Sequence, residues 1–249
     1  YLTLEKFNEL YAYRDIPVIF KNAFQHWEIK NKWTKDYLVN YLPDFIDSDD
    51  GEMNVKSFFN SNGKEYLRWQ IVPGSKLRND YLEEIPDYLS CWYKNNQLNK
   101  FPTKYFSWLY IGNKDSQTTL HQDVWKSSAW NYLVSGKKLW FFFPLSLGEK
   151  LEANTSKYSF ESFLSNKEED SFDNKIKPLI CVQNPGDMVF TPGDLWHSVL
   201  NLETSISITE NFINETNYYK VLSHFNKEKF NLKNINSMQQ MILDGFNNL

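Results

Sequence analysis

The chain has 249 residues, a length that suits one sizeable domain. Its 27 Lys and Arg residues are outnumbered by 31 Asp and Glu residues, which gives a net charge of −4. No dense basic cluster stands out, so the chain has few clustered cationic side chains to release counterions from a nucleic acid, which argues against nucleic-acid binding. Glycine is sparse at 9 residues and neither GxGxxG nor GxxxxGK[ST] occurs, which argues against a phosphate-binding loop.

The cysteines and the apolar runs bear on the cellular compartment. Only two cysteines occur, Cys91 and Cys181, and their separation excludes a CxxC motif; we expect two reduced thiols. The longest apolar run, Leu139–Leu145, is too short to span a bilayer, and no charged-then-apolar leader follows Tyr1. We therefore expect a soluble intracellular protein, cytoplasmic or nuclear, without membrane contact.

The first hundred residues have a mixed, largely helical pattern. Apolar residues recur at helical spacing in the first segment, Thr34 is a suitable N-cap for the second, and Ile16–Phe20 is a short β-prone run. The helices are expected at Leu2–Tyr13, Lys35–Tyr41 and Tyr88–Tyr93.

From Tyr105 the pattern changes to short strands rich in aromatic and β-branched residues. They are expected at Tyr105–Ile111, Ser128–Val134, Lys138–Phe143, Leu179–Val182, Met188–Thr191, His197–Asn201 and Ser205–Phe212. Turns are expected between them at Ser135-Gly136, Pro185-Gly186-Asp187 and Pro192-Gly193-Asp194. Such strands predict a mainly β fold with flanking helices, a barrel or sandwich rather than a βαβ sheet. The charged stretch Asn166–Lys177 is expected to be a solvated insertion, and the chain after Asn217 to be helical.

A candidate metal site begins with the sequence His121-Gln122-Asp123. On a strand, residues two apart point to the same face, so this segment presents an imidazole and a carboxylate side by side. His197, three residues after the Pro192-Gly193-Asp194 turn segment, is the candidate third ligand. Two histidines and one carboxylate on one face of an octahedron form the ligand set of non-haem iron(II) oxygenases. An HxD motif is weak by itself, and the other two histidines, His26 and His224, are interpreted as structural.

Two further features suggest a barrel that holds a ligand. The segment Ser205–Thr209 alternates small hydroxyl residues with isoleucine, so one face of this strand is polar. Lys138 precedes the apolar run Leu139–Phe143, and a lysine buried there needs an anionic partner to stay charged. The alternative is an edge-strand lysine that shields the sheet.

These residues lie in stretches that resemble the jumonji C family of 2-oxoglutarate oxygenases. The resemblance is strong over residues 105–215 and general before them, and it is closest to the jumonji protein-lysine hydroxylases once described as phosphatidylserine receptors. The matching stretches are Thr118–Asp123, Ser128–Asn131, Gly136–Pro144, Pro185–His197, Asn201-Leu202 and Ile208–Phe212.

The resemblance implies a double-stranded β-helix, a jelly-roll or cupin-like barrel, in a single jumonji C domain of residues 1–249. Its parts would be an N-terminal mixed helical and strand part (1–104), a catalytic barrel (105–215) and a C-terminal helical segment (216–249). It further implies that Fe(II) is bound by His121, Asp123 and His197.

The resemblance also implies a site for the cosubstrate 2-oxoglutarate. Lys138 would pair with its far carboxylate, Thr209 would hydrogen-bond the same carboxylate, and Asn131 would contact the cosubstrate near the metal. Thr118 matches a threonine that contacts cosubstrate or substrate. Its strand parity is opposite to that of His121, so only a bulge or turn would bring both to one side.

The implied function is a dioxygenase that uses O2 to hydroxylate a side chain of a protein or peptide, lysine first, with release of succinate and CO2. The alternatives are a histone or protein N-methyl demethylase of the same family and a non-catalytic jumonji-like binding module. The substrate pocket would be made from the aromatic-rich segments before residue 110 and from Trp125 and Trp130. A homodimer through the C-terminal helices is a hypothesis that rests on apolar residues at Phe230, Ile235, Met238, Met241, Ile242 and Phe246.

Overall fold

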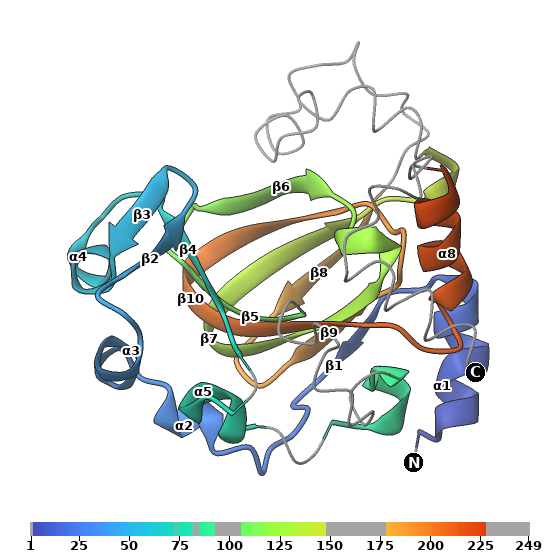
Figure 1. Cartoon of the computed structure of the whole chain (residues 1–249), viewed down its shortest axis with the longest axis horizontal. Coiled ribbons are helices and arrows are strands. Elements are labelled where there is room, and N and C mark those ends of the chain that lie inside the picture. Colours follow the sequence, from blue (N-terminus) through green and yellow to red (C-terminus); the bar gives the residue numbers. More distant parts are fainter. Residues whose placement is uncertain (1, 73, 82–84, 93–105, 148–177, 228–249) are drawn as a thin grey trace, which may run out of the picture.

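The computed structural model describes residues 2–72, 74–81, 85–92, 106–147 and 178–227. Within these residues the chain forms one large antiparallel sheet that curls over itself, with helices at its lower side and at both ends (Figure 1). The strands are β1 (Val18–Phe20), β2 (Phe45–Ser48), β3 (Gly51–Asn54), β4 (Tyr66–Gln70), β5 (Ser107–Gly112), β6 (Gln117–His121), β7 (Ser128–Phe142), β8 (Leu179–Gln183), β9 (Met188–Thr191) and β10 (His197–Phe212). The helices are α1 (Leu4–Leu10), α2 (Ile29–Lys32), α3 (Lys35–Tyr41), α4 (Val55–Asn60), α5 (Lys76–Asn79) and α8 (Tyr218–Lys227), with 3-10 turns η1 (Ala12–Arg14), η3 (Asp87–Leu89), η6 (Val124–Lys126) and η7 (Leu145–Leu147).

The long strands β7 and β10 join the two layers of the barrel. They pair with each other over almost their whole length, and the strand order is β1-β9-β7-β10-β5-β4-β2-β3. The first part of β10 also pairs with β6, whereas its second part pairs with β5. One strand therefore belongs to both walls, which is the double-stranded β-helix, and the predicted mainly β class is confirmed.

The prediction that Ser135-Gly136 ends a strand was wrong. Strand β7 runs through both residues, and the register with β10 shifts beside them. Gly136 has φ +87°, and a Cβ there would lie 2.3 Å from the carbonyl oxygen of Thr204. Only glycine fits this close approach, so the dipeptide forms a bulge instead of a turn. The partner strand β10 also continues past this bulge, so the two predicted strands His197–Asn201 and Ser205–Phe212 are one strand.

The N-terminal part contains more strand than the predicted, largely helical pattern. Strands β2, β3 and β4 extend the sheet beyond β5 and were missed, because single-sequence periodicity does not record pairing with a distant partner. Helix α3 was predicted correctly to the residue, and the Thr34 hydroxyl accepts a hydrogen bond from the Tyr37 amide at 3.2 Å. The predicted first helix divides into α1 and η1, and the predicted Tyr88 helix is only the short turn η3.

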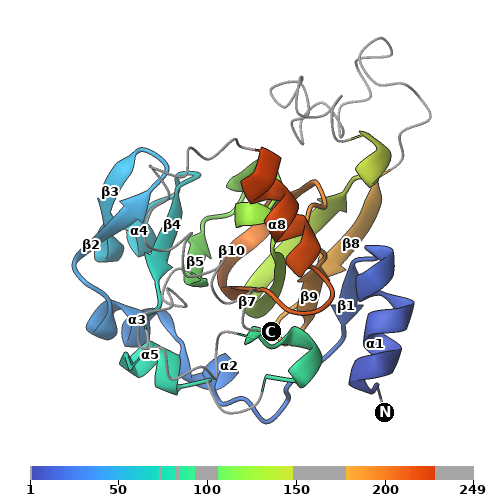
Figure 2. The ribbon, with the colours of Figure 1, turned by 45° about the vertical axis from the view of Figure 1, so that its right-hand side comes forward.

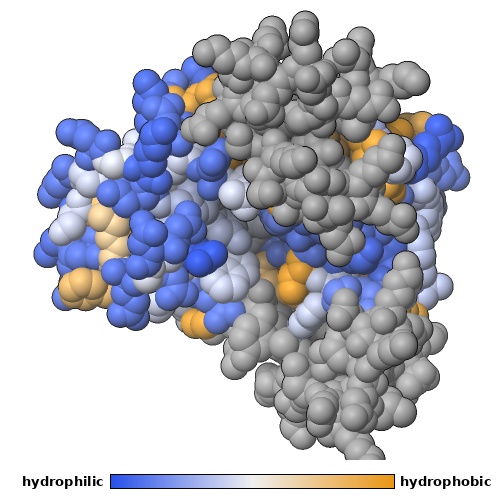
Figure 3. Space-filling view, turned by 90° about the horizontal axis from the view of Figure 1, so that it is seen from above, coloured by the Kyte–Doolittle hydropathy of each residue, from blue (hydrophilic) through white to orange (hydrophobic). Residues whose placement is uncertain are grey.

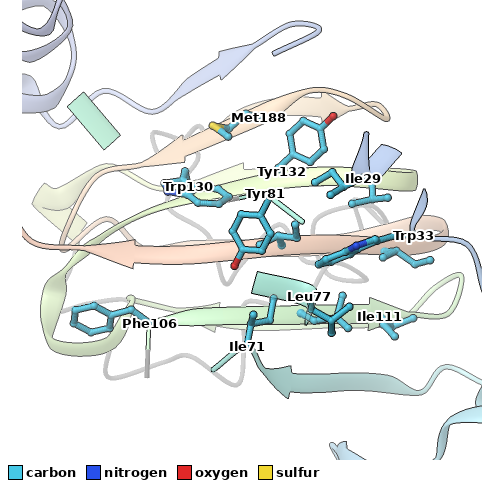
Figure 4. Packing of buried hydrophobic residues seen from close by; sticks show 14 of the residues in the cluster. Ile29, Trp33, Ile71, Leu77, Tyr81, Phe106, Ile111, Trp130, Tyr132 and Met188 are labelled. Atoms are coloured by element: carbon cyan, nitrogen blue, oxygen red, sulfur yellow. The ribbon is translucent and has the colours of Figure 1, made fainter. Parts of the chain in front are cut away.

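The main hydrophobic core lies outside the barrel, between the sheet and the N-terminal helices. Figure 4 shows Trp33, Tyr81 and Trp130 packed among aliphatic side chains there. Ile206 and Ile208 of β10 are buried in this core, so the isoleucine side of the predicted alternating strand faces outward from the barrel, as expected. The core draws on both the N-terminal part and the barrel; the single domain and its internal boundaries stay a prediction.

A buried ion pair crosses this core. Arg78 of α5 pairs with Glu210 of β10, and both side chains are less than a tenth exposed. The Arg78 guanidinium also donates to the Tyr81 hydroxyl at 2.9 Å and to the Ser107 hydroxyl at 3.0 Å. The two charges therefore neutralise each other, and the guanidinium has further hydrogen-bond acceptors, as a buried ion pair requires.

Several predictions fall on the far parts of the chain. Helix α8 confirms helical structure directly after Asn217. The Asn166–Lys177 stretch and the apolar C-terminal residues that carried the dimer hypothesis lie outside the described residues. The face in Figure 3 is mainly hydrophilic where it is coloured, and no helix among the described residues is long and apolar enough to span a membrane.

Breaking the buried ion pair should destabilise the fold strongly. Arg78→Ala should lower the free energy of unfolding by about 3–5 kcal/mol, because Glu210 would remain buried and unpaired. Lys137→Ala breaks the exposed Lys137–Glu203 pair and should cost less than about 1 kcal/mol. Urea unfolding followed by tryptophan fluorescence measures both, and equal losses would contradict this assignment.

Candidate metal centre

The structure brings together the three predicted ligand residues. His121 ends β6, Asp123 follows in extended conformation, and His197 opens β10. His121 and His197 are cross-strand partners with ring centroids 4.2 Å apart. One donor atom from each of the three residues lies within 4.8 Å of the other two. Because a single ion can contact all three atoms at this spacing, the residues form a candidate metal site.

Both imidazoles are oriented by the carbonyl group two residues before them. Nδ1 of His121 lies 2.8 Å from the carbonyl oxygen of Thr119, and Nδ1 of His197 lies 2.9 Å from that of Leu195. A carbonyl oxygen only accepts, so the proton of each neutral ring lies on Nδ1 and Nε2 keeps its lone pair. Burial, together with the nearby His121, lowers the pKa of His197 well below its ordinary value. His197 is therefore neutral at pH 7, the form that binds a metal.

The Asp123 carboxylate has the properties expected of a metal ligand. Burial raises its pKa, which His121 and a hydrogen bond from the Asn211 amide oppose. Its Oδ2 atom is buried and has no hydrogen-bond partner among the described residues. A buried carboxylate oxygen without a partner is costly unless a cation or donor binds it. The donor set thus fits a divalent metal.

The turn before His197 packs against the loop after Asp123. Gln122 points away from the metal site and donates to the Asp194 carbonyl oxygen at 2.7 Å and to the Asp194 carboxylate. Lys126 pairs with the same carboxylate at 2.7 Å. A Cβ on Gly193 would lie 2.3 Å from the Lys126 carbonyl oxygen, so only glycine allows this approach. These contacts fix the HxD segment relative to His197.

Helix α8 packs against η6, the turn that follows Asp123, and contacts the turn before His197. In Figure 2 it lies across the end of the barrel close to η6. Lys220 of α8 is buried, donates to the Gly193 carbonyl oxygen at 2.8 Å and forms an ion pair with Asp15. The C-terminal helix is therefore connected to the turn that precedes a metal ligand.

A polar cavity extends from the three ligands into the barrel. Three hydroxyl groups of β10 face this side, as the alternating pattern predicted. Ser205 donates to Asn201 at 2.6 Å, Ser207 accepts from Lys138 at 2.8 Å, and Thr209 accepts from Asn131 at 2.7 Å. The cavity is lined by Tyr66, Tyr110, Thr118, His121, Asp123, Ala129, Trp130, Asn131, Lys138, Trp140, Thr191, His197, Val199 and Thr209.

Lys138 is the cation of this cavity. It is 1% exposed, so the edge-strand interpretation is excluded. Burial lowers its pKa to about 7, and among the described residues no carboxylate forms an ion pair with it. Its neighbours are the neutral Ser207 hydroxyl and the Tyr66 ring, whose centroid is 5.9 Å from Nζ. An anionic ligand would supply the missing counter-charge.

Asn131 is held between two neighbours on the cavity wall. It is the cross-strand partner of Thr209, and Gln183 donates to both its side-chain and its backbone oxygen, at 3.1 and 2.9 Å. Gln183 is fully buried and also accepts from the Trp140 indole at 2.8 Å. These bonds fix the orientation of the Asn131 amide.

Thr118 reaches the cavity because of a bulge. The pairing of β6 with β10 shifts register between His121 and Thr118, so three residues of β6 face two of β10. This is the irregularity that the parity argument required. Thr118 is hydrogen-bonded to the Tyr66 hydroxyl, and burial raises the pKa of Tyr66 to about 12. Tyr66 is therefore neutral and available as a hydrogen-bond donor.

The two tryptophans expected in a substrate pocket have different positions. Trp130 is fully buried, and its ring packs against Trp27 and Tyr81 in the main core, so it is mainly a core residue. Trp125 lies in η6 between Asp123 and β7, is partly buried, and has φ +55°. Its ring is 5.5 Å from that of Phe106. A tryptophan with a left-handed backbone conformation two residues after Asp123 is strained, and such backbone strain is common at functional sites.

The comparison with known families agrees with this site. The family described as "JmjC domain, hydroxylase" matches residues 108–212, a range that includes all three candidate ligands and Lys138. Residues 108–212 are therefore a jumonji C domain. The double-stranded β-helix is the fold that such a domain implies.

Curated relatives match most of the chain. It is 28% identical over 248 residues to "Arginine-specific demethylase JMJ22" of Arabidopsis thaliana, covering 91% of this chain and 47% of the relative. It is 30% identical over 191 residues to "2-oxoglutarate and iron-dependent oxygenase JMJD4" of Mus musculus, covering 74% and 42%. It is 26% identical over 249 residues to "Bifunctional arginine demethylase and lysyl-hydroxylase psr-1" of Caenorhabditis elegans, covering 88% and 61%. The chain thus spans about half the length of these relatives.

The sequence reasoning missed five residues that shape the site. Asn211 could have been found, because it continues the alternation of Ser205, Ser207 and Thr209 by one step. The others depend on pairing between distant strands or on a turn packed against a loop, for which the sequence carries no local signal. The missed residues are Tyr66, Tyr110, Gln122, Gln183 and Asn211.

Gln122 should matter for metal binding although its side chain points away from the metal site. Gln122→Leu removes the bonds to Asp194 and should weaken Mn(II) or Fe(II) binding about 10- to 100-fold, as removal of supporting groups typically does. Anaerobic titration calorimetry measures this. Gln117→Leu, on β6 close in the chain but outside the cavity lining, is the matched control, and equal affinity of the two variants would contradict the prediction.

Proposed function

We propose that this protein is an Fe(II)- and 2-oxoglutarate-dependent dioxygenase that hydroxylates a protein side chain, lysine first. The observation that carries the proposal is one cavity with a complete two-histidine, one-carboxylate set and a buried lysine that has no anionic partner within the described part of the chain. The two histidines and the carboxylate suit iron(II), and the buried lysine suits the carboxylate of an organic acid. A core without function would retain neither, because each buried charge is costly.

The names of the relatives support the two cofactors. JMJD4 of Mus musculus is named as 2-oxoglutarate- and iron-dependent. In this chain His121, Asp123 and His197 would hold the iron. Bound iron and 2-oxoglutarate together supply the oxidation of a C–H bond by O2, with release of succinate and CO2.

The protein residues would bind and orient the cosubstrate. The Lys138 ammonium would pair with its far carboxylate, and the hydroxyl of Thr209 would hydrogen-bond the same group. Asn131, fixed by Gln183, would contact the end nearer the metal, and Thr118 would contact the cosubstrate beside Tyr66. The apolar side chains of Trp140 and Val199, which line the cavity, would exclude water.

Protein hydroxylation is the preferred reaction, and N-methyl demethylation is the second candidate. The psr-1 relative is named as both a lysyl-hydroxylase and an arginine demethylase, and JMJ22 as an arginine-specific demethylase. The two reactions share their first step, since demethylation begins with hydroxylation of the methyl group. A non-catalytic binding module is disfavoured, because degenerate sites lose a ligand or the lysine and this chain keeps all of them.

The direct test measures succinate formed from 2-oxoglutarate with Fe(II) and ascorbate, with and without lysine- and arginine-rich peptides. Wild-type protein should form succinate, and mass spectrometry should find a gain of one oxygen in a peptide. Asp123→Ala should abolish turnover, because two imidazoles alone bind Fe(II) weakly and without fixed geometry. Asp44→Ala, at an exposed aspartate, is the control; the proposal fails if wild type neither turns over nor binds 2-oxoglutarate.

Binding of 2-oxoglutarate should depend on pH through Lys138. Its pKa of about 7 in the free protein means that the ammonium form, which binds the anion, is lost as the pH rises. The dissociation constant should therefore be constant well below pH 7 and rise above it, by at most about tenfold per pH unit. Calorimetry of the Mn(II)-loaded protein in buffers of different ionisation enthalpy should record proton uptake. Lys138→Met should bind weakly without this dependence, whereas Lys137→Met should behave as wild type.

A further inference from the structure

Gln70, the last residue of β4, has an amide without any hydrogen bond among the described residues. Its Nε2 atom is buried, and the residue is partly buried. An unsatisfied buried amide typically costs about 1–3 kcal/mol, so each case in a native fold needs an explanation. The two other unsatisfied amides, Asn8 and Asn214, each use their second amide atom in a hydrogen bond. Gln70 uses neither.

The register of the sheet places Gln70 on the cavity side. Gln70 is opposite Trp108, Trp108 is opposite Thr209, and Thr209 is opposite Asn131. Directly opposite residues of an antiparallel sheet point to the same face. Because Thr209 and Asn131 line the cavity, all four side chains lie on that face. Gln70 is two strands from Thr209, or about 10 Å at the usual strand spacing.

Two aromatic rings connect Gln70 with the metal site. Trp108 is stacked on Tyr110, with ring centroids 6.4 Å apart and an angle of 23° between planes. Both are partly buried, and Tyr110 lines the cavity. Tyr110 and Asp123 line the same cavity, and the two stacked rings form an aromatic surface from there towards Gln70.

We propose that Gln70 binds the main chain of the peptide substrate, whose reacting side chain lies over Trp108 and Tyr110 towards the metal. This rests on the proposed function and adds where the substrate is held. A primary amide offers one donor and one acceptor, which complement the C=O and N–H groups of a peptide. The aliphatic stem of a lysine or arginine packs well on aromatic rings, and its charged end gains from ring faces. Recognition through the main chain would be independent of the flanking sequence.

The test compares Gln70→Leu and Gln70→Glu with the control Gln117→Leu, a partly buried glutamine on β6 that does not line the cavity. The probe is a pool of random nonapeptides with a fixed central lysine, and a second pool has a central arginine. Peptide-stimulated succinate formation gives the KM for each pool. Both Gln70 variants should raise this KM at least about tenfold, the loss of one to two hydrogen bonds, with the KM for 2-oxoglutarate unchanged.

Thermal unfolding distinguishes recognition from a structural role. Replacing an unsatisfied amide by an apolar group of similar size is neutral or stabilising, so Gln70→Leu should keep or raise the Tm. A lowered Tm, a peptide KM no higher than that of Gln117→Leu, or an equal rise in the KM for 2-oxoglutarate would each overturn the proposal. If the wild type forms no succinate with or without peptides, the proposed function fails, and this inference fails with it.

Discussion

The pairing of the end of β6 with the start of β10 is the constraint on which the site depends. It places His121 opposite His197, and each ring is oriented by a carbonyl group of its own segment. The pairing persists because the loop after β6 and the turn before β10 are joined by Gln122, Asp194 and a glycine that permits close contact. The relative position of the candidate ligands therefore follows from backbone pairing, and sites built on strands are more precise than sites on loops.

Two buried cationic side chains, Arg78 and Lys138, differ in whether the protein itself supplies a counter-charge. Arg78 is paired with Glu210 and surrounded by hydroxyl groups, so its charge is neutralised within the protein. Lys138 is also buried, but the partners that the described residues give it are a neutral hydroxyl and an aromatic ring. The first cation connects a helix to the sheet. The second would be stabilised by a bound anion, which is the role proposed for the carboxylate of 2-oxoglutarate.

The two faces of the sheet divide these tasks. Outward residues such as Ile206 and Ile208 pack against the N-terminal helices, and this core makes the strands rigid. Inward residues of the same strand carry the hydroxyls that hold Lys138 and Asn131. Because β4 widens the sheet beyond β5, the inward face continues past the candidate metal site as an aromatic surface. It ends at Gln70, whose buried Nε2 atom has no hydrogen-bond partner among the described residues.

The sequence by itself determined the class of fold and indicated the HxD segment, its candidate third ligand and the hydroxyl-lined strand, because each depends on spacing along one strand or on one turn. It also identified Lys138 as unusual, since a lysine beside an apolar run is a local feature. Only the tertiary structure decided how Thr118 and Lys138 come to face the same cavity, because bulges at two strand pairings reverse the side-chain parity. Likewise Tyr66, Tyr110 and Gln70 gain their places from the register between strands far apart in the chain, and that register is fixed by packing over the whole sheet rather than by any local pattern.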